Sequence, residues 1–553
     1  MMACALPALA CTNLIVSKGA TTDGSTFITY AADSHTRYGQ LRYCPAADHP
    51  EGATLKLYNY GSLKFQIEIP QPAHTYQVVG FINEHQLAIG ETTWGGREEL
   101  AHGSGKGIDY GNLIYVTLQR ARNCREAIKV MHELVSTYGY SDGGESFSIA
   151  DPNEVWIYEI INKGDETGAV WVARRVPDGY ICGHANQARI TTFPQMRKES
   201  YKSIDSRNLK YIDRPEVECV YASDVVKFAK QRGWYSGKDA DFSFADTYNP
   251  LTFSGLRACE ARVYAMFNRA CAEHDQTGAN LTSSMKRYEA FAMGDKNAER
   301  LPLWVKPNRK LDVQDVMALM RDHFEGTPMD MTQDVGAGPF HCPYRWRPMD
   351  FEVDGKKYVH ERAISTQQTG FSFVAQCRSW LPNKLGGVIW FGVDDTYSTC
   401  YCPMFCCIDS VPLCFREGNG SMSQYSPTSA FWLFNRVSNF CYLRYDSMIV
   451  DVRNMQKECE DYFISSVEKL KSTTTPAQLT GLSHHLAEIM MEAWNRLDQL
   501  LLTKYIDGNI KYVKDGQIET TPTGVVRFPQ QPPYPDWFYR AIVNDHGEVL
   551  QVK

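Results

Sequence analysis

Strand-length apolar segments separated by turn residues dominate the first third of the chain. Residues 12–18 and 25–32 are two such segments, and Asp23-Gly24 between them is a strong hairpin turn signal. Residues 76–82 and 86–91 predict a second hairpin. Since a hairpin pairs its two strands antiparallel, this part of the chain predicts antiparallel sheet layered with helices rather than alternating βαβ units.

Helices and further strands follow in blocks. An amphipathic helix with apolar residues from 127 to 138 is expected between Asn123, its N-cap, and Gly139, its C-terminal stop. Strands are expected at 146–149, 155–161 and 169–176, then helices around 224–231, 257–269 and 313–324, a strand-rich stretch over 358–393, and helices at 448–470 and 477–505. Thr475-Pro476 has the N-cap and first-turn residues that would start the last helix.

Composition excludes several classes of protein. A hydrophobic content of 43% is ample for a large core and argues against disorder. A net charge of −7, without a long run of Lys or Arg, argues against nucleic acid or an anionic membrane as a partner. No apolar run reaches about 18 residues, so no membrane-spanning helix is expected.

The chain has 17 cysteines, which is high for a cytosolic enzyme, whereas an exported protein could pair several of them. Five lie close together: Cys400, Cys402, Cys406, Cys407 and Cys414. Their spacing does not match paired C-x-x-C zinc knuckles and no histidine lies nearby, so we interpret them as buried thiols or disulfide partners. We therefore expect neither a metal nor an organic cofactor.

The segment Gly139-Tyr140-Ser141-Asp142-Gly143 matches G-x-S-x-G, the pattern of a serine nucleophile elbow. That elbow requires a strand before the serine and a helix after it. Here a predicted helix precedes the motif and a predicted strand follows it, so a helix C-terminus with a turn explains these glycines better.

The junction Ala8-Leu9-Ala10-Cys11 is the most informative feature for function. Residues 1–10 are apolar and end in the small-x-small pattern that precedes a signal-peptidase cut, although the segment is short and lacks a basic start, so we expect an upstream stretch to be missing. Cleavage after Ala10 would leave Cys11 with a free α-amine of pKa about 7.7–8, able to act as general base for its own thiol. From the junction alone, a nucleophile, a structural cysteine and a lipid-attachment cysteine all remain open.

Several separated motifs favour the nucleophile. They are, in chain order, Cys11-Thr12-Asn13-Leu14-Ile15-Val16, Thr22-Asp23-Gly24-Ser25-Thr26, Asp33-Ser34, Asn83-Glu84, Glu91-Thr92-Thr93, Gly183-His184-Ala185-Asn186-Gln187-Ala188-Arg189-Ile190, Glu361-Arg362-Ala363-Ile364-Ser365-Thr366 and Trp390-Phe391-Gly392. Together they closely resemble the cysteine dipeptidases related to dipeptidase A and the secernins. That family belongs to the N-terminal-nucleophile hydrolases, with penicillin V acylase and bile salt hydrolase as cousins.

The resemblance implies an α+β fold, an αββα sandwich of the N-terminal-nucleophile type with added helical and strand-rich segments. By matching position it implies Cys11 as nucleophile, Asn186 as oxyanion donor and Asp33 as the acid that orients the cysteine amine. It places Thr92 among the polar groups that line the site and Arg262 as a supporting arginine. Against these roles, Asn186 could merely satisfy a turn, Asp33 could be a strand-end acid, and Arg262 could be a surface or salt-bridge residue.

One departure from the family pattern stands out. The family commonly has Arg-Asn before the acidic pair, where this chain has Tyr30-Ala31-Ala32-Asp33. An arginine that would stabilise a thiolate or a substrate carboxylate is missing there. This affects the expected substrate more than the expected reaction.

We therefore expect an exported cysteine-type dipeptidase, periplasmic or extracellular, that acts on dipeptides or very short peptides. Residues 1–10 would be removed, 11–400 would form the hydrolase core with insertions, and 401–553 would form a mainly helical part packed on it. A homo-oligomer is compatible with the sequence. The alternatives are an amidase for N-acyl amino acids or β-lactams within the same superfamily, and a non-catalytic surface lipoprotein lipidated at Cys11.

Overall fold

Two large sheets form the centre of the computed structural model, which describes residues 11–197, 199–274 and 280–552. The first sheet has seven strands, all paired antiparallel, in the order β19-β14-β1-β2-β22-β23-β24. Their bounds are Trp304–Val305 (β19), Ile181–His184 (β14), Asn13–Val16 (β1), Thr26–Asp33 (β2), Thr369–Cys377 (β22), Val388–Val393 (β23) and Cys402–Phe405 (β24). Every residue of β1 and β2 is buried, as expected for central strands covered on both faces.

The second sheet has nine strands in the order β15-β16-β13-β12-β11-β10-β9-β8-β3. Their bounds are Ser203–Asp205 (β15), Cys219–Tyr221 (β16), Glu166–Arg175 (β13), Val155–Lys163 (β12), Gly144–Ala150 (β11), Ala88–Trp94 (β10), Ile82–Asn83 (β9), Val78–Val79 (β8) and Tyr43–Cys44 (β3). The pair β15–β16 is parallel and the other neighbours are antiparallel.

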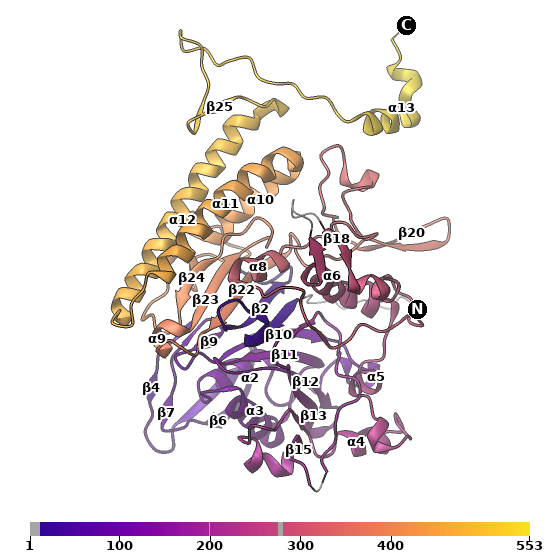
Figure 1. Cartoon of the computed structure of the whole chain (residues 1–553), viewed down its shortest axis with the longest axis vertical. Helices are drawn as coiled ribbons and strands as arrows, with labels where there is room; N and C mark the ends of the chain where they lie inside the picture. The colour runs from indigo at the N-terminus through magenta and orange to yellow at the C-terminus, as the bar shows by residue number, and fades with distance from the viewer. Residues whose placement is uncertain (1–10, 198, 275–279, 553) are drawn as a thin grey trace.

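The two sheets pack face to face between layers of helices (Figure 1). Strands β1 and β2 of the first sheet contact β10 and β11 of the second. Helices α2 (Tyr110–Leu118) and α3 (Cys124–Tyr138) pack on the nine-stranded sheet. Helices α6 (Ala261–Ala270), α8 (Val313–Leu319), α10 (Ala430–Cys441), α11 (Tyr445–Glu468) and α12 (Pro476–Tyr505) pack on the seven-stranded sheet. The core is thus a helix–sheet–sheet–helix arrangement with mainly antiparallel sheets.

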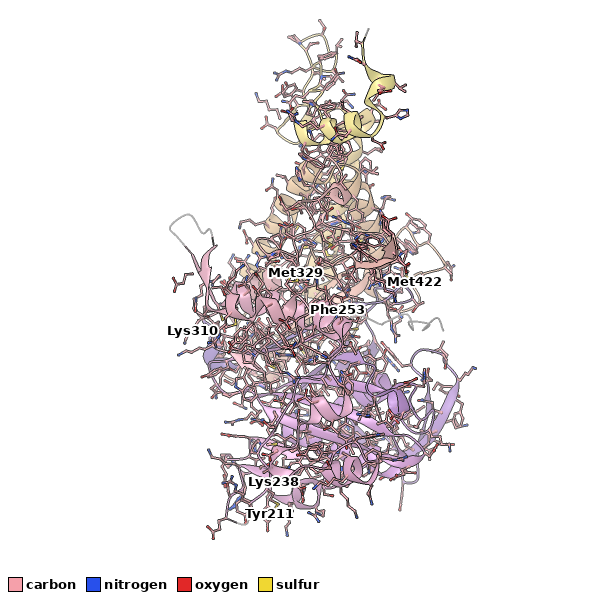
Figure 2. The ribbon with its side chains drawn as sticks, turned by 90° about the vertical axis from the view of Figure 1, so that its right-hand side faces the viewer. Tyr211, Lys238, Phe253, Lys310, Met329 and Met422 are labelled. Atoms are coloured by element: carbon pink, nitrogen blue, oxygen red, sulfur yellow. The ribbon has the colours of Figure 1, made fainter. Side chains whose placement is uncertain are left out.

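Smaller elements surround this core. The short helices are α1 (Glu98–Ala101), α4 (Val225–Gln231), α5 (Phe244–Tyr248), α7 (Glu289–Ala292) and α9 (Asn383–Gly386). The small hairpins pair β4 (Ala47–Asp48) with β7 (His74–Thr75), β5 (Thr54–Tyr58) with β6 (Phe65–Pro70), β17 (Ala272–His274) with β18 (Asn280–Ser283), β20 (Asp350–Val353) with β21 (Lys356–Val359), and β25 (Val513–Lys514) with β26 (Gln517–Ile518). The last helix, α13 (Asp536–Leu550), lies at the opposite end of the molecule from Tyr211 and Lys238 (Figure 2).

Local sequence signals explain the best-predicted helices. In α3 the side chain of Asn123 accepts a hydrogen bond from the Glu126 N–H, and Gly139 ends the helix with a positive φ of 89°. Both predicted ends are therefore confirmed, and the helix–strand order around Gly139 excludes a serine elbow. In α12 Thr475 forms a capping box with Gln478, and Pro476 occupies the first turn as predicted.

The hairpin predictions are confirmed in pairing and corrected in detail. Strands β1 and β2 pair antiparallel, but a short 3-10 turn at Lys18–Ala20 makes their connection longer than a tight turn. The second predicted hairpin is wrong in its boundaries. Gly80, with a φ of 58°, turns the chain inside the predicted strand, so β8, β9 and β10 form a three-stranded meander. Glycine adopts this left-handed conformation without the steric cost that a side chain would impose.

Other predictions differ from the structure in extent. The helix expected at 313–324 ends at Leu319, and Phe324 has a left-handed φ of 66° that a continuing helix would not allow. Helices α10 and α13 were not expected from the sequence. The 16 cysteines within the described ranges are all free thiols, including the five between 400 and 414. Among the same residues no group of three or more His, Cys, Asp or Glu side chains could hold a metal ion, and no helix has the length and apolarity needed to cross a membrane.

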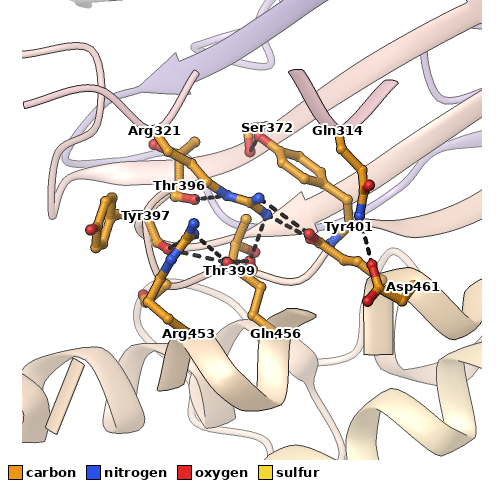
Figure 3. Close-up of polar contacts among 12 residues, drawn as sticks. Gln314, Arg321, Ser372, Thr396, Tyr397, Thr399, Tyr401, Arg453, Gln456 and Asp461 are labelled. Atoms are coloured by element: carbon orange, nitrogen blue, oxygen red, sulfur yellow. Dashed lines mark hydrogen bonds and ion pairs between the residues drawn. The ribbon is translucent and has the colours of Figure 1, made fainter. Parts of the chain in front are cut away.

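A buried ion pair fastens α11 to the core (Figure 3). Arg321, just after α8, donates to Glu460 of α11 at 2.6 Å and to the Thr399 carbonyl at 3.2 Å. Glu460 also accepts the Tyr401 backbone N–H at 2.9 Å, and both members of the pair are almost fully buried. The charges are therefore compensated where three separate segments meet.

Breaking this pair should destabilise the whole protein. Glu460→Ala leaves the Arg321 charge buried without its partner, a change that typically costs about 3–5 kcal/mol. We expect thermal unfolding to shift down by several degrees. The matched control is Lys457→Ala, which breaks the exposed Lys457–Asp461 pair on the same helix and should change stability by about 0.5 kcal/mol or less. Equal melting temperatures for the two variants would contradict the role of the buried pair.

Candidate functional site

Cys11 directly precedes β1 in the middle of the seven-stranded sheet, and it is 3% exposed. Its position is held by the backbone of the next residue, since Thr12 and Ala31 exchange N–H···O hydrogen bonds of 3.2 and 3.0 Å. Cys11 therefore sits between β14 and β2, at the face that meets β10 and β11 of the second sheet.

Acidic and phenolic groups surround the Cys11 sulfur. Its Sγ lies 3.8 Å from the Tyr30 hydroxyl and 3.8 Å from Glu91 Oε1, and Tyr30 donates a short hydrogen bond to Glu91. Burial raises the pKa of the Cys11 thiol well above its ordinary value, and the charges of Glu91 and Asp33 raise it further. The Asp33 backbone N–H and the Tyr30 hydroxyl act in the opposite direction. These surroundings favour the neutral thiol over the thiolate, so a base next to the sulfur is needed to remove its proton.

Asp33 ends β2 and is fully buried. Its carboxylate forms an ion pair of 2.5 Å with Arg362 and accepts a hydrogen bond of 2.6 Å from Thr369. Burial raises the pKa of Asp33, while Arg362 and Thr369 act to lower it. A guanidinium therefore reaches this acid from residue 362, although the segment before Asp33 contains no arginine.

Arg262 connects the first strand with the predicted oxyanion residue. It lies on α6 and is 1% exposed, so it is not the surface residue that a helical arginine often is. One guanidinium nitrogen donates to the Cys11 carbonyl at 2.6 Å and to Thr12 Oγ1 at 2.7 Å. The other donates to Asn186 Oδ1 at 2.8 Å and to the Ala185 carbonyl at 3.2 Å. Burial, together with the charge of Arg362, lowers the pKa of Arg262 to about 10.

Asn186 follows β14 in a left-handed conformation, with a φ of 61°. Its side-chain amide nitrogen donates to the Thr93 carbonyl of β10, so the residue links the two sheets. The buried pair of Arg189 and Glu260, 2.9 Å apart, anchors the same loop to the residue directly before α6, the helix that carries Arg262. Asn186 is therefore held from both sides, as a residue with a fixed geometric task requires.

Thr92 lies in a separate buried chain of hydrogen bonds. Its hydroxyl is 2.6 Å from His184 Nδ1, and His184 Nε2 is 2.7 Å from the Ser148 hydroxyl. Asn13 donates to Ser148 at 3.3 Å. Burial lowers the pKa of His184 to about 3, so this imidazole is neutral in the folded protein. Among the described contacts it is the neighbouring Glu91, and not Thr92, that reaches the Cys11 sulfur.

The structure thus brings Cys11, Asp33, Asn186 and Arg262 together. Sequence reasoning did not assign a role to Tyr30, Glu91 or Arg362. Two of these could have been found, because Glu91 and Arg362 lie within the motifs Glu91-Thr92-Thr93 and Glu361-Arg362-Ala363. Tyr30 lies in the segment where the chain departs from the family pattern, which is itself a signal.

A cavity of about 470 Å³ adjoins this group of residues. Thr369, which bonds the Asp33 carboxylate, and Ser34, which follows Asp33, both line it. Its other walls include Arg347 and Trp346. The cavity is large enough for a small organic molecule, and polar, cationic and apolar side chains all line it.

The protein has the two-sheet core and buried-cysteine site of a candidate cysteine hydrolase, and comparison with known proteins gives its family. Residues 48–458 match the model of peptidase family C69, so the chain belongs to that family. It is 23% identical to a probable dipeptidase from Latilactobacillus sakei, over 90% of this chain and 95% of the relative. It is also 25% identical to a probable dipeptidase from Salmonella dublin, over 72% and 81%, and 22% identical to a probable dipeptidase B from Lactococcus lactis, over 88% and 94%.

The neutral His184 generates a testable pH dependence. Its pKa of about 3 in the folded state lies below the value of about 6.5 for an exposed histidine. Between pH 3 and pH 6.5 the histidine binds a proton in the unfolded chain but not in the folded protein. The contribution of His184 to the free energy of unfolding is therefore complete above pH 6.5 and is lost as the pH falls towards 3. The loss is at most about 1.4 kcal/mol per pH unit.

We therefore expect the melting temperature of His184→Gln to fall less than that of the wild type between pH 6.5 and pH 4.5. The control His102→Gln changes an exposed loop residue and should follow the wild-type pH dependence. Parallel curves for His184→Gln and the wild type would show that His184 does not remain neutral.

Proposed function

We propose that this protein is a dipeptidase that cleaves dipeptides or very short peptides through an acyl-enzyme on Cys11. The observation that carries the proposal is the convergence of the Cys11 carbonyl, Thr12 and Asn186 on the buried guanidinium of Arg262. Membership of peptidase family C69 supports peptide-bond hydrolysis. The relatives named as probable dipeptidases support a dipeptide as the substrate.

The fold proposed for the core is the αββα sandwich of the N-terminal-nucleophile hydrolases. Two face-to-face, mainly antiparallel sheets between helical layers support this assignment (Figure 1). The position of Cys11 at the start of a central strand supports it as well. In this fold the chain must be cut before the nucleophile, which agrees with the small-x-small sequence Ala8-Leu9-Ala10.

The first step of the proposed mechanism is activation of the thiol. While Ala10 and Cys11 remain joined, the Cys11 nitrogen is an amide and cannot accept a proton. Cleavage converts it to an amine of pKa about 7.7–8, which can take the thiol proton near neutral pH. The resulting ammonium lies beside the thiolate and offsets the effects of burial and of Glu91 that keep the thiol neutral.

The second step is attack on the substrate. The Cys11 thiolate forms a bond to the scissile carbonyl carbon, and the carbonyl oxygen becomes an oxyanion that the Asn186 amide and backbone N–H groups stabilise. One such donor is typically worth roughly 3–4 kcal/mol. The C–N bond then breaks as the Cys11 ammonium gives its proton to the leaving amine. Water, activated by the same amine, hydrolyses the thioester and releases the carboxylic acid and the free thiol.

The proposed location is outside the cytoplasm, in the periplasm or the extracellular space. The support is the apolar segment that ends in Ala8-Leu9-Ala10, which lies outside the described residues. Sequencing the N-terminus of the active protein tests the cut and the mechanism together. The mature chain should begin at Cys11, and an active protein that begins at Met1 or beyond Thr12 would exclude the mechanism.

Substitution and alkylation of Cys11 test the nucleophile. Cys11→Ser keeps the amine but has a hydroxyl of much higher pKa than the thiol, so turnover of a dipeptide should nearly disappear, and Cys11→Ala should lose the covalent route entirely. Iodoacetamide should abolish wild-type activity, whereas EDTA should leave it unchanged. Cys44→Ser is the control, since this half-buried thiol lies on β3, at the edge of the nine-stranded sheet, and it should keep both activity and sensitivity to iodoacetamide. Activity that resists alkylation and is lost with EDTA would refute the thiol mechanism.

Asn186→Ala tests the oxyanion role separately. The thiolate should still form, so iodoacetamide should alkylate Cys11 at close to the wild-type rate. The loss should fall on the transition state and lower kcat by roughly a hundred- to a thousandfold. Near-normal kcat with a change only in KM would instead make Asn186 a binding or turn residue.

A further inference from the structure

Glu91, which lies beside the Cys11 sulfur, and the neighbouring Glu145 are carboxyl groups that do not bind the substrate or transfer a proton in the mechanism above. Glu91 of β10 is 1% exposed and Glu145 of β11 is fully buried, and their strands are adjacent in the sheet. Glu91 Oε1 accepts the Tyr30 hydroxyl, and Glu145 Oε2 accepts the Thr93 hydroxyl at 3.1 Å. Glu91 Oε2 and Glu145 Oε1 are buried and accept no hydrogen bond from any N–H group or from any Ser, Thr or Tyr hydroxyl of the described residues.

The charge of this pair is also not balanced. Within the described ranges neither glutamate forms an ion pair with a lysine, arginine or histidine. The Arg37 guanidinium is close enough to Glu91 to interact with its charge, but it donates its hydrogen bond to the Tyr110 hydroxyl at 2.5 Å and not to Glu91. Asp142 adds a third acid, and burial raises its pKa to about 7. Burying a carboxylate without a partner costs free energy, so such a group is expected to be protonated or to bind a cation.

The pKa of Glu145 supports this interpretation. Burial raises it well above the ordinary value, and the charge of Glu91 and a hydrogen bond between the two carboxyl groups raise it further. A shared proton between two carboxylates is what a buried acidic pair adopts when no cation is present. An arriving ammonium group would replace that proton and supply three N–H donors to the oxygens that lack them.

We propose that Glu91 and Glu145 bind the α-ammonium group of the substrate's first residue and thereby select peptides with a free N-terminus. This inference rests on the proposed function and specifies its substrate class. The peptide bond that is cut would then be the one that follows the amino-terminal residue.

The covalent geometry of a peptide agrees with this assignment. In any amino-terminal residue the ammonium nitrogen is two bonds from the carbonyl carbon, or about 2.5 Å away. A nucleophile attacks that carbon from about 3–3.5 Å, so the nitrogen must come within about 6 Å of the sulfur. Glu91 Oε1 is 3.8 Å from Sγ and therefore within reach of that nitrogen.

A blocked substrate meets a different environment at the same place. An N-acyl group brings a neutral amide with a single N–H donor, and a substrate without the amine brings no donor. Either leaves the pair of glutamates without a compensating charge. A site built to hydrogen-bond a substrate N–H group strongly disfavours an analogue that lacks it, because its own polar groups then remain buried and unpaired.

The experiment compares alanyl-alanine with propionyl-alanine, which differ only in the ammonium group. For mature wild-type enzyme, kcat/KM should favour alanyl-alanine by at least about a hundredfold. In Glu91→Gln and Glu145→Gln, which keep the size of the side chain, this ratio should fall by at least about tenfold because kcat/KM for alanyl-alanine falls far more. Asp394→Asn is the matched control. It neutralises another buried carboxyl group, which bonds Asn435 and Ser438 of α10 instead, and it should keep the wild-type ratio.

A second measurement separates substrate binding from an effect on the nucleophile. Iodoacetamide should alkylate Cys11 in Glu91→Gln at least as fast as in the wild type, because removing the charge of Glu91 removes one of the causes that raise the pKa of the thiol. A much slower alkylation, with equal losses for both substrates, would mean that Glu91 is needed to activate the Cys11 amine or thiol, and it would overturn the inference. An unchanged ratio in both glutamine variants would overturn it too. If the wild type cleaves neither substrate, the proposed function itself fails.

Discussion

The buried guanidinium of Arg262 is the contact on which the arrangement of the site depends. It lies where the start of β1 and the end of β14 meet, and it donates to the Cys11 carbonyl, 251 residues earlier in the chain, and to Asn186, 76 residues earlier. A charge in this position needs several acceptors to offset its loss of hydration. The carbonyl groups of Cys11 and Ala185, the Thr12 hydroxyl and the Asn186 amide oxygen supply them, so each of these groups is held in one geometry. The same contacts that stabilise the cation therefore hold the backbone of Cys11 and the side chain of Asn186 on one guanidinium.

Charge around the site is divided into two regions. On one side Arg262 and Arg362 lie close enough to influence each other, and Arg362 is paired with Asp33. On the other side Glu91 and Glu145 share a buried region with Tyr30 and have no cationic partner within the described chain. The sulfur of Cys11 lies at the boundary between them. A peptide that binds across this boundary would present its ammonium group to the acids and its developing oxyanion to the donors near Arg262, which is the order of charges along a peptide's first residue.

The family match begins at residue 48, after the segment that holds Cys11 and Asp33. The sheet shows how this segment belongs to the rest of the core. Strand β1 pairs with β14, and β2 pairs with β22 over most of its length, so the first residues lie between strands that the family match includes. The site is therefore shared between the start of the chain and its middle. Removing either part would leave unpaired backbone groups in the centre of the seven-stranded sheet.

Short sequence patterns correctly predicted those structural features that are determined by interactions between residues close in sequence. Asn123, Gly139 and Thr475-Pro476 correctly predicted helix ends because capping hydrogen bonds and backbone preferences act over a few residues. The antiparallel pairing of the first two strands was also readable. The role of Cys11 as nucleophile stays a prediction. By contrast, the turn at Gly80 and the end of α8 depend on what packs against them. The burial of Arg262, the pairing of Asp33 with Arg362 and the position of Glu91 beside the sulfur were decided by the tertiary structure. These groups are tens to hundreds of residues apart, and burial brings them together and sets their charges, which no local pattern in the sequence encodes.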